Sequence, residues 1–567
     1  MTTVAAPTAR ERSTPPARWD RRWWLIAGIA LTAWAVWSAG RQQRELVNGR
    51  GWGQVGDFFA AMFRPDLSAE MIELTVREAG VTVGFALLGS ALALAIGTLG
   101  GVLLTERMWS PQHGRPLRRG RIGWHVSRVL FALPRSMHEV VFGLLLVNIL
   151  GLDPLVAVLA LGIPYGAVTA KVFAELLDDA PIEAEQTLRA TGAGRLTAFA
   201  YGTVPHAIPD LLSYGFYRFE CALRGAAVLG IIGAGGLGFQ LALSFSSLRY
   251  DEMWTLLWAL ILLSGVVDRW SSTVRQRRNA LAVEANLAPH ADSSARRAPG
   301  ASTYAADRFL RLSALTCAIG VPVAWWLLGV DPSTLWSERA RTLGRELLVD
   351  AWPPSIGDGG WSELVGDSLQ TVALAVLALA ISFALAVPLS FLSHRPQVRR
   401  TGASAFARRT LAGALRFIML IARSVPPPVW AFVVVFVLFP GLWPGAVALA
   451  IYNAGVLGRL QGEVVENHDS RPTRVLMATG ATTTAAMTVA TIPGVAGRFL
   501  GLGLYRWEVV IRETVIVGVV GAAGLGRRLD EQTSAFDYDG ILATIGALFV
   551  VTIAVDAVSA AVRRSVR

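Results

Sequence analysis

One apolar segment occurs twice in this chain. It reads YRFECALRGAAVLGIIGAGGLG at residues 217–238 and YRWEVVIRETVIVGVVGAAGLG at residues 505–526. The two copies align without a gap at an offset of 288 residues, and 10 of their 22 positions are identical. Each copy has two arginines and a glutamate near its start and a glycine cluster at its end. Because a charge inside a membrane-spanning segment is costly, such charges usually mark a transport path or a buried ion pair.

The composition is typical of a membrane protein. Of the 567 residues, 53% are hydrophobic and 16% are charged, whereas a soluble domain carries about 25% charged residues. A transmembrane helix needs about 20 mainly apolar residues, and runs of this kind predict an all-α, polytopic membrane fold with twelve spans. The expected spans are 23–38, 81–105, 129–150, 154–173, 208–232 and 253–267 in the first half, and 309–330, 371–392, 415–439, 444–460, 493–520 and 541–562 in the second.

The net charge of +11 is distributed unevenly along the chain. Arginines gather in segments 106–128, 269–311 and 395–416 and at the C-terminus, while the short connections 151–153 and 440–443 contain none. This is the positive-inside pattern of membrane proteins, and it predicts that both termini lie in the cytoplasm. The basic charge therefore indicates a membrane topology, and we expect no nucleic-acid partner.

The offset of 288 residues extends beyond the repeated segment. It matches Arg135 with Arg423 and Pro205 with Pro493. Each half holds six expected spans, an even number, so the two halves should run parallel and be related by an axis along the membrane normal. A Ser-, Ala- and Arg-rich stretch between them predicts a flexible cytoplasmic linker. The predicted organisation is a first repeat at 1–270, a linker at 271–305 and a second repeat at 306–567.

A cytoplasmic loop of the first half reads DDAPIEAEQTLRATGAGRLTAFAYGTVPHAIP at residues 178–209. An ordinary amphipathic surface loop would explain it, but its order of Glu-Ala, a glycine after a small residue and a later proline resembles the EAA loop of ABC-importer permeases. In that family the loop docks into a cleft on the ATPase subunit. The implied coupling residues are Glu183, Ala184, Glu185 and Gly192, with Pro472 and Gly480 in the second half. The second copy has Arg471-Pro472-Thr473 in place of Glu183-Ala184-Glu185, so we expect the halves to engage the ATPase differently.

The sequence also indicates that ATP is bound elsewhere. A phosphate-binding P-loop needs the pattern G-x-x-x-x-G-K-[ST], but the single lysine, Lys171, lies between Ala170 and Val172. We therefore expect this chain to bind no cofactor and to be no enzyme, with ATP and Mg on a separate ATPase. The histidines show no metal-ligand spacing, so no metal site is expected.

The charged residues of the repeated segment are the candidates for a substrate pathway. Tyr217, Glu220 and Arg224 are spaced along one helix face, whereas Arg218 is expected to point elsewhere. Two interpretations remain open: an internal Glu220–Arg224 ion pair, or arginines that supply positive potential for an anion. The candidate pathway residues are Tyr217, Arg218, Glu220, Arg224, Tyr505, Arg506, Glu508 and Arg512. Arg135 and Arg423 are secondary candidates, for which snorkelling toward the cytoplasmic surface is an equal alternative.

The glycine clusters end an apolar helix and do not join a strand to a helix, so they do not form a dinucleotide-binding motif. Glycine permits a sharp turn or a close approach of helices, and we expect a turn on the outer side of the membrane in each half. The glycines concerned are Gly233, Gly235, Gly236 and Gly238, and Gly521, Gly524 and Gly526.

The pattern YRFExxxR…VLGxxGAGGLG after an Ala-Thr-Gly-Ala loop resembles the phosphonate-import permeases among type I ABC importers. The resemblance covers residues 75–267 and, more weakly, 365–562, where Trp507 replaces Phe219 and Ala523 replaces Gly235. It implies a type I ABC-importer transmembrane fold in the bacterial plasma membrane, with two permease halves fused in one chain.

The same resemblance implies import of a phosphonate, or of phosphate or phosphite, by alternating access. The implied partners are a dimeric ABC ATPase, an extracytoplasmic solute-binding protein and the surrounding membrane lipid. Three alternatives stay open at this point: an ABC permease for another small solute such as methionine, an ion-coupled secondary transporter, and a non-transport membrane scaffold or receptor. The paired docking loops disfavour the second alternative.

Overall fold

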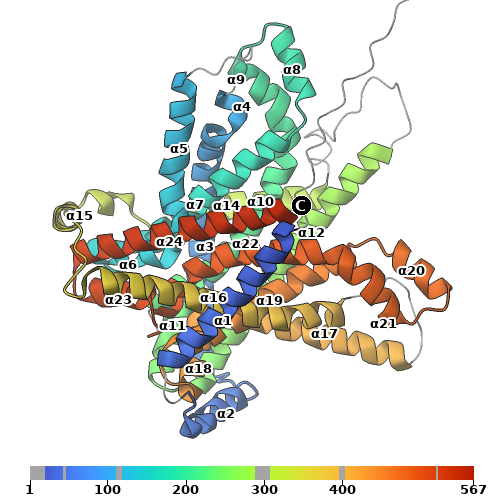
Figure 1. The fold of residues 1–567 in the computed structure, drawn as a ribbon. Coiled ribbons are helices and arrows are strands. Elements are labelled where there is room, and N and C mark those ends of the chain that lie inside the picture. Colours follow the sequence, from blue (N-terminus) through green and yellow to red (C-terminus); the bar gives the residue numbers. More distant parts are fainter. Residues whose placement is uncertain are drawn as a thin grey trace, which may run out of the picture.

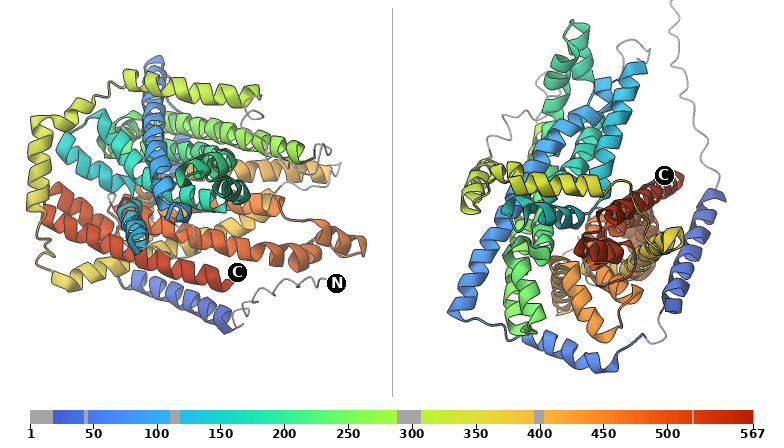
Figure 2. Two further views of the ribbon diagram at one scale, coloured as in Figure 1. Left: turned by 90° about the horizontal axis from the view of Figure 1, so that it is seen from above. Right: turned by 90° about the vertical axis from the view of Figure 1, so that its left-hand side faces the viewer.

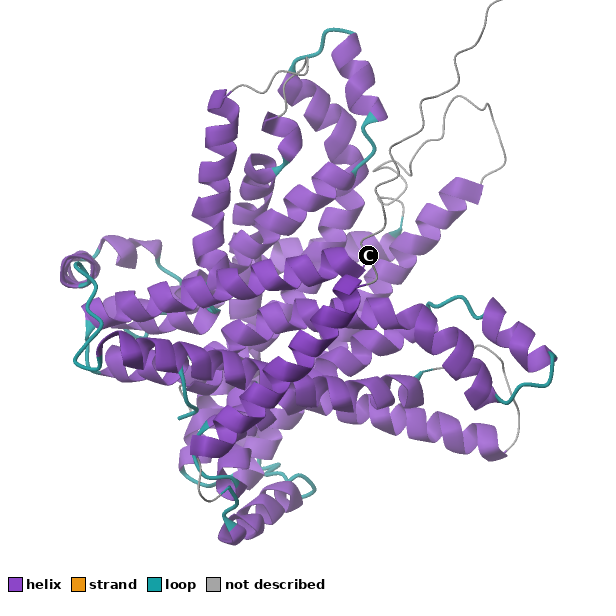
Figure 3. Cartoon of the chain, viewed as in Figure 1, coloured by secondary structure: helices purple, strands orange, loops and turns teal. Residues whose placement is uncertain are grey.

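The computed structural model describes residues 19–42, 46–109, 118–287, 307–394, 403–518 and 521–566, which are almost entirely helical (Figures 1 and 3). Within these ranges the only strand-like contact is an isolated bridge between Val47 and Leu438. Eight of the described helices are long and apolar enough to cross a membrane, or up to eleven if each of three bent pairs counts as one span. The prediction of an all-α polytopic membrane protein is therefore confirmed.

The described residues of the first half form fifteen helical elements. They are α1 (Trp19–Gln42), η1 (Gly49–Gly51), α2 (Trp52–Ala61), α3 (Ala69–Leu104), α4 (Glu106–Trp109), α5 (Arg118–Ser136), α6 (Glu139–Leu150), α7 (Pro154–Asp179), α8 (Glu183–Ala190), α9 (Arg195–Ala198), η2 (Phe199–Thr203), α10 (Val204–Leu229), η3 (Gly230–Ala234), α11 (Gly236–Ser246) and α12 (Tyr250–Leu287) in the described residues.

The second half repeats most of this order. Its described elements are α14 (Arg308–Leu327), η4 (Pro332–Trp336), α15 (Glu338–Asp350), α16 (Gly360–Ser393), α17 (Ala403–Ser424), α18 (Pro427–Val437), α19 (Leu442–Glu466), α20 (Arg471–Ala478), α21 (Thr483–Ala486), η5 (Met487–Thr491), α22 (Ile492–Gly518), α23 (Leu525–Ser534) and α24 (Tyr538–Val566).

The sequence predicts twelve spans, whereas at most eleven helices or bent pairs in the described residues are long and apolar enough to cross a membrane. The expected span 444–460 lies in α19, a helix of 25 residues that is not among them. Asn453 and Arg459 reduce the apolar content of this helix, and Asn453 is completely buried. Because α19 is packed inside the protein, it does not need the apolar surface that lipid contact demands.

Two spans that the sequence predicts as continuous are broken. The span at 129–150 consists of α5 and α6, which meet at 83°, and the span at 415–439 consists of α17 and α18, which meet at 96°. At the second break, three consecutive prolines at 426–428 supply no backbone N–H to continue α17, and they suit the first turn of a new helix. At the first break, His138 caps α6 by accepting the amide N–H of Val140 at 3.3 Å.

The two halves are interleaved. Helix α1 of the first half packs against α16 of the second, and α14 of the second half packs against α3 of the first. In both views of Figure 2 the dark-blue α1 lies beside the gold and red helices of the second half. The loop after α1 also contacts the other half, since Asn48 donates its backbone N–H to the carbonyl of Val437 at 2.7 Å. Each half therefore buries part of its apolar surface against the other.

The segment between the halves differs from the prediction at its start. Helix α12 continues through Leu287, so residues 271–287 of the predicted linker are helical, and residues 288–305 lie outside the described residues. The stretch 271–287 contains neither glycine nor proline, and its three alanines, three arginines and two leucines favour helix. The first proline after it is Pro289.

Candidate functional site

The two copies of the repeated segment lie in α10 and α22 and line one cavity of about 520 Å³. Helices α6, α7, α17, α18 and α19 complete its wall, so both halves contribute. Seven of the eight predicted pathway residues line it, namely Tyr217, Arg218, Glu220, Arg224, Tyr505, Arg506 and Arg512. Glu508 is outside the lining and instead pairs with Arg563 at 2.5 Å.

The cavity is lined by groups that donate hydrogen bonds. Six arginines contribute: Arg218, Arg224, Arg423, Arg459, Arg506 and Arg512. Five tyrosines contribute: Tyr165, Tyr214, Tyr217, Tyr452 and Tyr505. Five carboxylates also line it: Glu139, Asp210, Glu220, Glu463 and Glu513. Guanidinium groups hold oxyanions through paired N–H donors, so the chemistry of the cavity depends on which arginines are already paired with carboxylates.

Helix α10 presents a wide face to this cavity. The lining positions Asp210, Tyr214, Arg218, Cys221 and Gly225 recur at the three- and four-residue spacing of one helix face. Arg218 lines the same cavity as Tyr217, Glu220 and Arg224, although its own contacts are with Tyr165 and Tyr214.

Arg218 is 7% exposed and sits among aromatic side chains. Its guanidinium lies 4.6 Å from the centre of the Tyr165 ring and donates to the Tyr214 hydroxyl at 2.8 Å. The Nε atom is buried and has no hydrogen-bond partner among the described residues. The Tyr165 hydroxyl donates to Glu139 at 2.9 Å.

Arg506, at the equivalent position of the second half, has a different environment. Its guanidinium donates to Glu513 at 2.6 Å and also to the side-chain oxygen of Asn453. Asn453 in turn donates to Glu513 at 3.0 Å, so the three side chains form a closed, buried cluster. The charge of Arg506 is therefore compensated within the protein.

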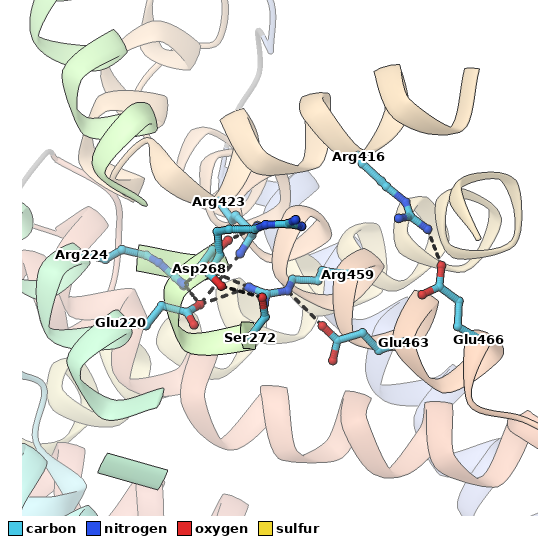
Figure 4. A network of polar contacts seen from close by, with 10 residues as sticks. Glu220, Arg224, Asp268, Ser272, Arg416, Arg423, Arg459, Glu463 and Glu466 are labelled. Atoms are coloured by element: carbon cyan, nitrogen blue, oxygen red, sulfur yellow. Dashed lines mark hydrogen bonds and ion pairs between the residues drawn. The ribbon is translucent and has the colours of Figure 1, made fainter. Parts of the chain in front are cut away.

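A second group of charges, most of which line the cavity, joins the two halves (Figure 4). Glu220 accepts from Arg224 at 2.6 Å and from Arg459 at 3.2 Å. Asp268 on α12 lies 3.0 Å from Arg459 and also pairs with Arg423. The Glu220–Arg224 ion pair, one of the two interpretations that the sequence left open, is present within a network that connects α10 and α12 to α17 and α19.

The equivalent group on the other side of the pseudo-twofold axis is more open. Arg135 approaches Asp556 at 3.8 Å, while Lys171 pairs with Glu175 at 3.9 Å on its own helix. Arg512 donates to the backbone carbonyl of Arg135 at 2.7 Å. The two interfaces between the halves are therefore electrostatically unequal, and Arg135 lies at an interface outside the cavity lining.

Comparison with protein families now identifies the class of protein. The family described as "Binding-protein-dependent transport system inner membrane component" matches residues 97–270 and again residues 400–567. The chain belongs to this family. The double match shows that two permease halves are fused in one chain, in agreement with the 288-residue repeat.

Several relatives of this permease have curated names. It is 28% identical over 441 residues to the "Phosphate-import permease protein PhnE" of Mycolicibacterium smegmatis, covering 77% of each chain. It is 32% identical over 157 residues to the "Putative phosphite transport system permease protein HtxE" of Stutzerimonas stutzeri, covering 28% of this chain and 60% of the relative. A solved structure of the MetNI methionine ABC transporter is 20% identical, with a TM-score of 0.32, and covers 37% of this chain and 99% of that chain.

Membership of the family fixes the general role. The permease is the membrane-spanning subunit of an ABC importer, works with an ATPase and a solute-binding protein, and is itself not an enzyme. An ion-coupled secondary transporter, which the sequence alone left open, is excluded by this membership. Among the described residues, no group of three or more His, Cys, Asp and Glu side chains is placed to hold a metal ion.

The predicted coupling loop of the first half is held together by Glu185. Its carboxylate is buried, accepts from Thr203 at 2.6 Å and pairs with Arg189 at 2.5 Å and Arg107 at 3.5 Å. Glu185 thus stabilises the coupling loop through buried contacts, whereas Glu183 is exposed on the surface of the loop.

In the second half the equivalent position is Thr473, which shares a hydrogen bond of 3.0 Å with Thr491. The two loops nevertheless end their first helix in the same way. Gly192 has a φ of +89° and Gly480 a φ of +93°, the left-handed conformation that glycine adopts without steric cost. Pro472 occupies the first turn of α20, and Ala184 the first turn of α8.

The glycine clusters lie where α10 and α22 end. Gly235 and Gly524 have φ of +100° and +98° and precede α11 and α23. Thr82 accepts the amide N–H of Leu237 at 2.9 Å, and Thr371 accepts that of Leu525 at the same distance. Of the other predicted glycines, Gly233, Gly236 and Gly521 also have positive φ, while Gly238 and Gly526 bring helices into close backbone contact.

Several cavity residues were missed by the sequence analysis. Tyr165 and Tyr452 stand in apolar helices without a charged neighbour in their immediate sequence, and Glu139 and Glu513 were not singled out. Asp268 could have been found from the repeat, because the offset of 288 residues matches it with a second aspartate, Asp556. Arg459 is matched with Lys171 in the same way, so a search for charges at equivalent positions would have found both.

Proposed function

We propose that this permease imports phosphonates, or the related oxyanions phosphate and phosphite, by alternating access. The observation that carries the proposal is the single cavity between the two repeated segments, with its six arginines and five tyrosines. Relatives named for phosphate and phosphite transport support the same class of substrate. A methionine permease of the same family would not require a cavity with so many cationic donors.

The size and chemistry of the cavity suit a small oxyanion. Its volume of about 520 Å³ lies within the range of about 300–1,000 Å³ that is usual for small-molecule sites. Arginine and tyrosine both donate hydrogen bonds, and an oxyanion only accepts them from such groups. Positive charge near the path offsets the free-energy cost of moving an anion through a region of low dielectric constant.

The proposed orientation places the chain termini and the two coupling loops in the cytoplasm. Figure 1 shows α8–α9 and α20–α21 at the top and right of the molecule, and α2, α15 and α18 at the bottom and left. Arg107, in the arginine-rich segment 106–128, pairs with Glu185 of α8, and Figure 1 shows α4 and α5 at the same end of the molecule as α8 and α9. This supports a cytoplasmic position by the positive-inside pattern.

The partners follow from this orientation. One subunit of a dimeric ABC ATPase would dock on each coupling loop, at 183–203 and 471–491, with ATP and Mg bound there and no cofactor on this chain. An extracytoplasmic solute-binding protein would deliver the anion at the opposite face, near the glycine turns. Membrane lipid would surround the apolar outer helices of this multi-pass protein in the bacterial plasma membrane.

Uptake measurements test the proposal. The full chain is purified with its ATPase and reconstituted into proteoliposomes with its binding protein, and ATP-dependent uptake of phosphate, phosphite and methylphosphonate is compared with uptake of methionine. We expect uptake of at least one oxyanion and none of methionine. Uptake of methionine alone would overturn the assignment of an anionic substrate.

A further inference from the structure

The six arginines of the cavity differ in what compensates their charge. Arg224, Arg423, Arg459 and Arg506 each pair with a carboxylate within 4 Å. Arg512 has no such pair in the described residues, but its guanidinium donates to the backbone carbonyls of Glu508 and Arg135. Arg218 has neither kind of partner. Among the described residues its guanidinium donates to the hydroxyl of Tyr214, and its buried Nε has no hydrogen-bond partner.

The repeat explains why Arg218 is uncompensated. Its counterpart Arg506 is neutralised by Asn453 and Glu513, and the offset of 288 puts Tyr165 and Gly225 at these two positions. A Cβ atom added to Gly225 would lie 2.8 Å from the Tyr165 hydroxyl and 3.1 Å from Glu139. Tyr165 and Glu139 therefore fill the space into which a carboxylate at position 225 would extend, and they bond to each other.

The tyrosines around Arg218 can act as further donors. Tyr214 accepts the hydrogen bond of Arg218 through its oxygen, so its own O–H proton can be given to another acceptor. Tyr217 and Tyr505 line the same cavity from α10 and α22. The ring faces of Tyr165 and Tyr214 lie 4.6 and 5.5 Å from the guanidinium and hold it in place through cation–π contact.

We propose that Arg218, with the hydroxyls of Tyr214 and Tyr217, forms the transient binding site for the oxyanion inside the cavity. Arg506 is paired with Glu513 and takes no part in this contact. The substrate therefore binds on the side of the cavity that the first half contributes. This inference rests on the proposed function and specifies which of the repeated arginines holds the substrate. The free guanidinium donors meet the oxygens of a phosphonate or phosphate, which are all acceptors.

The first test removes the charge. Arg218→Gln should lower the rate of phosphate uptake in the reconstituted complex by about tenfold or more, because a charge-assisted hydrogen bond to an anion is worth at least one factor of ten. Arg218→Lys should give an intermediate rate, since it retains the charge but not the forked donors. Assembly with the ATPase is measured by size-exclusion chromatography for each variant, and rates are compared per assembled complex.

The second test keeps Arg218 and neutralises it, so it does not depend on how Arg218→Gln folds. In a Glu139→Gln, Tyr165→Asn background, Gly225→Glu copies the pairing of the second half, and Gly225→Gln has the same shape without the charge. The space is adequate because Leu161, which also lies near Gly225, is matched by Leu449, where Glu513 is already accommodated. Uptake by the Gly225→Glu variant should be about tenfold lower than by its Gly225→Gln control.

The outcomes separate the two claims. If the unmodified complex takes up no oxyanion, both the proposed function and the role of Arg218 fall. If it takes up phosphate, and Arg218→Gln or the Gly225→Glu variant transports it as fast as its control, only the role of Arg218 is overturned. A lower rate in both tests supports the site.

Discussion

The unequal interfaces between the two halves give a quantitative prediction about Asp268. Its side chain is 10% exposed and pairs with Arg423 and Arg459 from the other half. The equivalent Asp556 is 31% exposed and approaches Arg135 only to 3.8 Å. The same substitution, Asp→Asn, therefore removes a buried bridge at one interface and a loose, partly exposed one at the other.

The expected cost follows from burial. Asp268→Asn leaves buried arginines without one of their carboxylates, which should lower the free energy of unfolding by about 3–5 kcal/mol. Asp556→Asn removes a pair screened by solvent, which should cost about 0–1 kcal/mol. Adding Arg423→Gln to Asp268→Asn removes the uncompensated charge as well, so the double variant should recover part of the loss, with a coupling energy of about 0.5–3 kcal/mol.

The assay is reversible unfolding of the full chain in mixed detergent micelles, titrated with sodium dodecyl sulfate. The 19 tryptophans provide the fluorescence signal. Matched titrations of Asp268→Asn, Asp556→Asn, Arg423→Gln and the Asp268→Asn, Arg423→Gln double variant give the four differences in free energy that this comparison needs. Equal losses for Asp268→Asn and Asp556→Asn, or additive effects of Asp268→Asn and Arg423→Gln, would refute the conclusion that the first interface is an electrostatic bridge between the halves.

Three further predictions concern the coupling loop, the glycine turn and the cap of α14. Glu185→Gln should lower the stability of the first coupling loop by about 1.5–3 kcal/mol, because it loses charge-assisted bonds to Thr203 and Arg189. Thr473→Val should lower the stability of the second loop by only about 0.5–1.5 kcal/mol. Hydrogen exchange of 183–203 and 471–491 measures both effects, and a larger effect in the second loop would contradict the role of Glu185. Gly238→Ala should lower the free energy of unfolding by about 1–3 kcal/mol, because the added Cβ would lie 1.9 Å from the carbonyl oxygen of Ala227. Gly501→Ala is the control, because a Cβ there meets open space. Equal stability of the two variants in detergent would refute the contact. Amide N–H groups, that of Leu310 foremost, hold the pKa of Asp307 below its usual value. This cap therefore stabilises α14 at neutral pH, and its contribution is lost as the pH falls through the lowered pKa. The stability of Asp307→Asn should change less between pH 7 and pH 3 than that of the unmodified chain, and an identical change would contradict the role of the carboxylate.

Much of the site could be predicted because its residues are close together in sequence. Tyr217, Arg218, Glu220 and Arg224 stand within one apolar helix, and their charge makes them visible without any tertiary information. The repeat then identifies their counterparts in the second half. The role of each arginine could not be predicted, because it depends on partners from other helices, such as Glu513 for Arg506 and Asp268 for Arg423.

The fold shows the same division between local and tertiary information. The spans follow from apolar length, and the break before α18 has a visible cause in the prolines at 426–428. The break between α5 and α6 lies at Met137 and His138, where no residue type forbids a helix. The packing of α1 against α16 has no signature in either segment, since two apolar helices could each have packed within their own half.

The central claim is that the cavity between α10 and α22 is on the path of the substrate. Cys221 lines this cavity, one turn from Arg218, and can be labelled with an anionic thiosulfonate in a Cys317→Ser background. In the complete complex with the ATPase and binding protein, phosphate should slow labelling of Cys221, and trapping the ATPase with vanadate should change the side of the membrane from which the reagent reacts. Labelling that is unaffected by phosphate and by vanadate would contradict the claim.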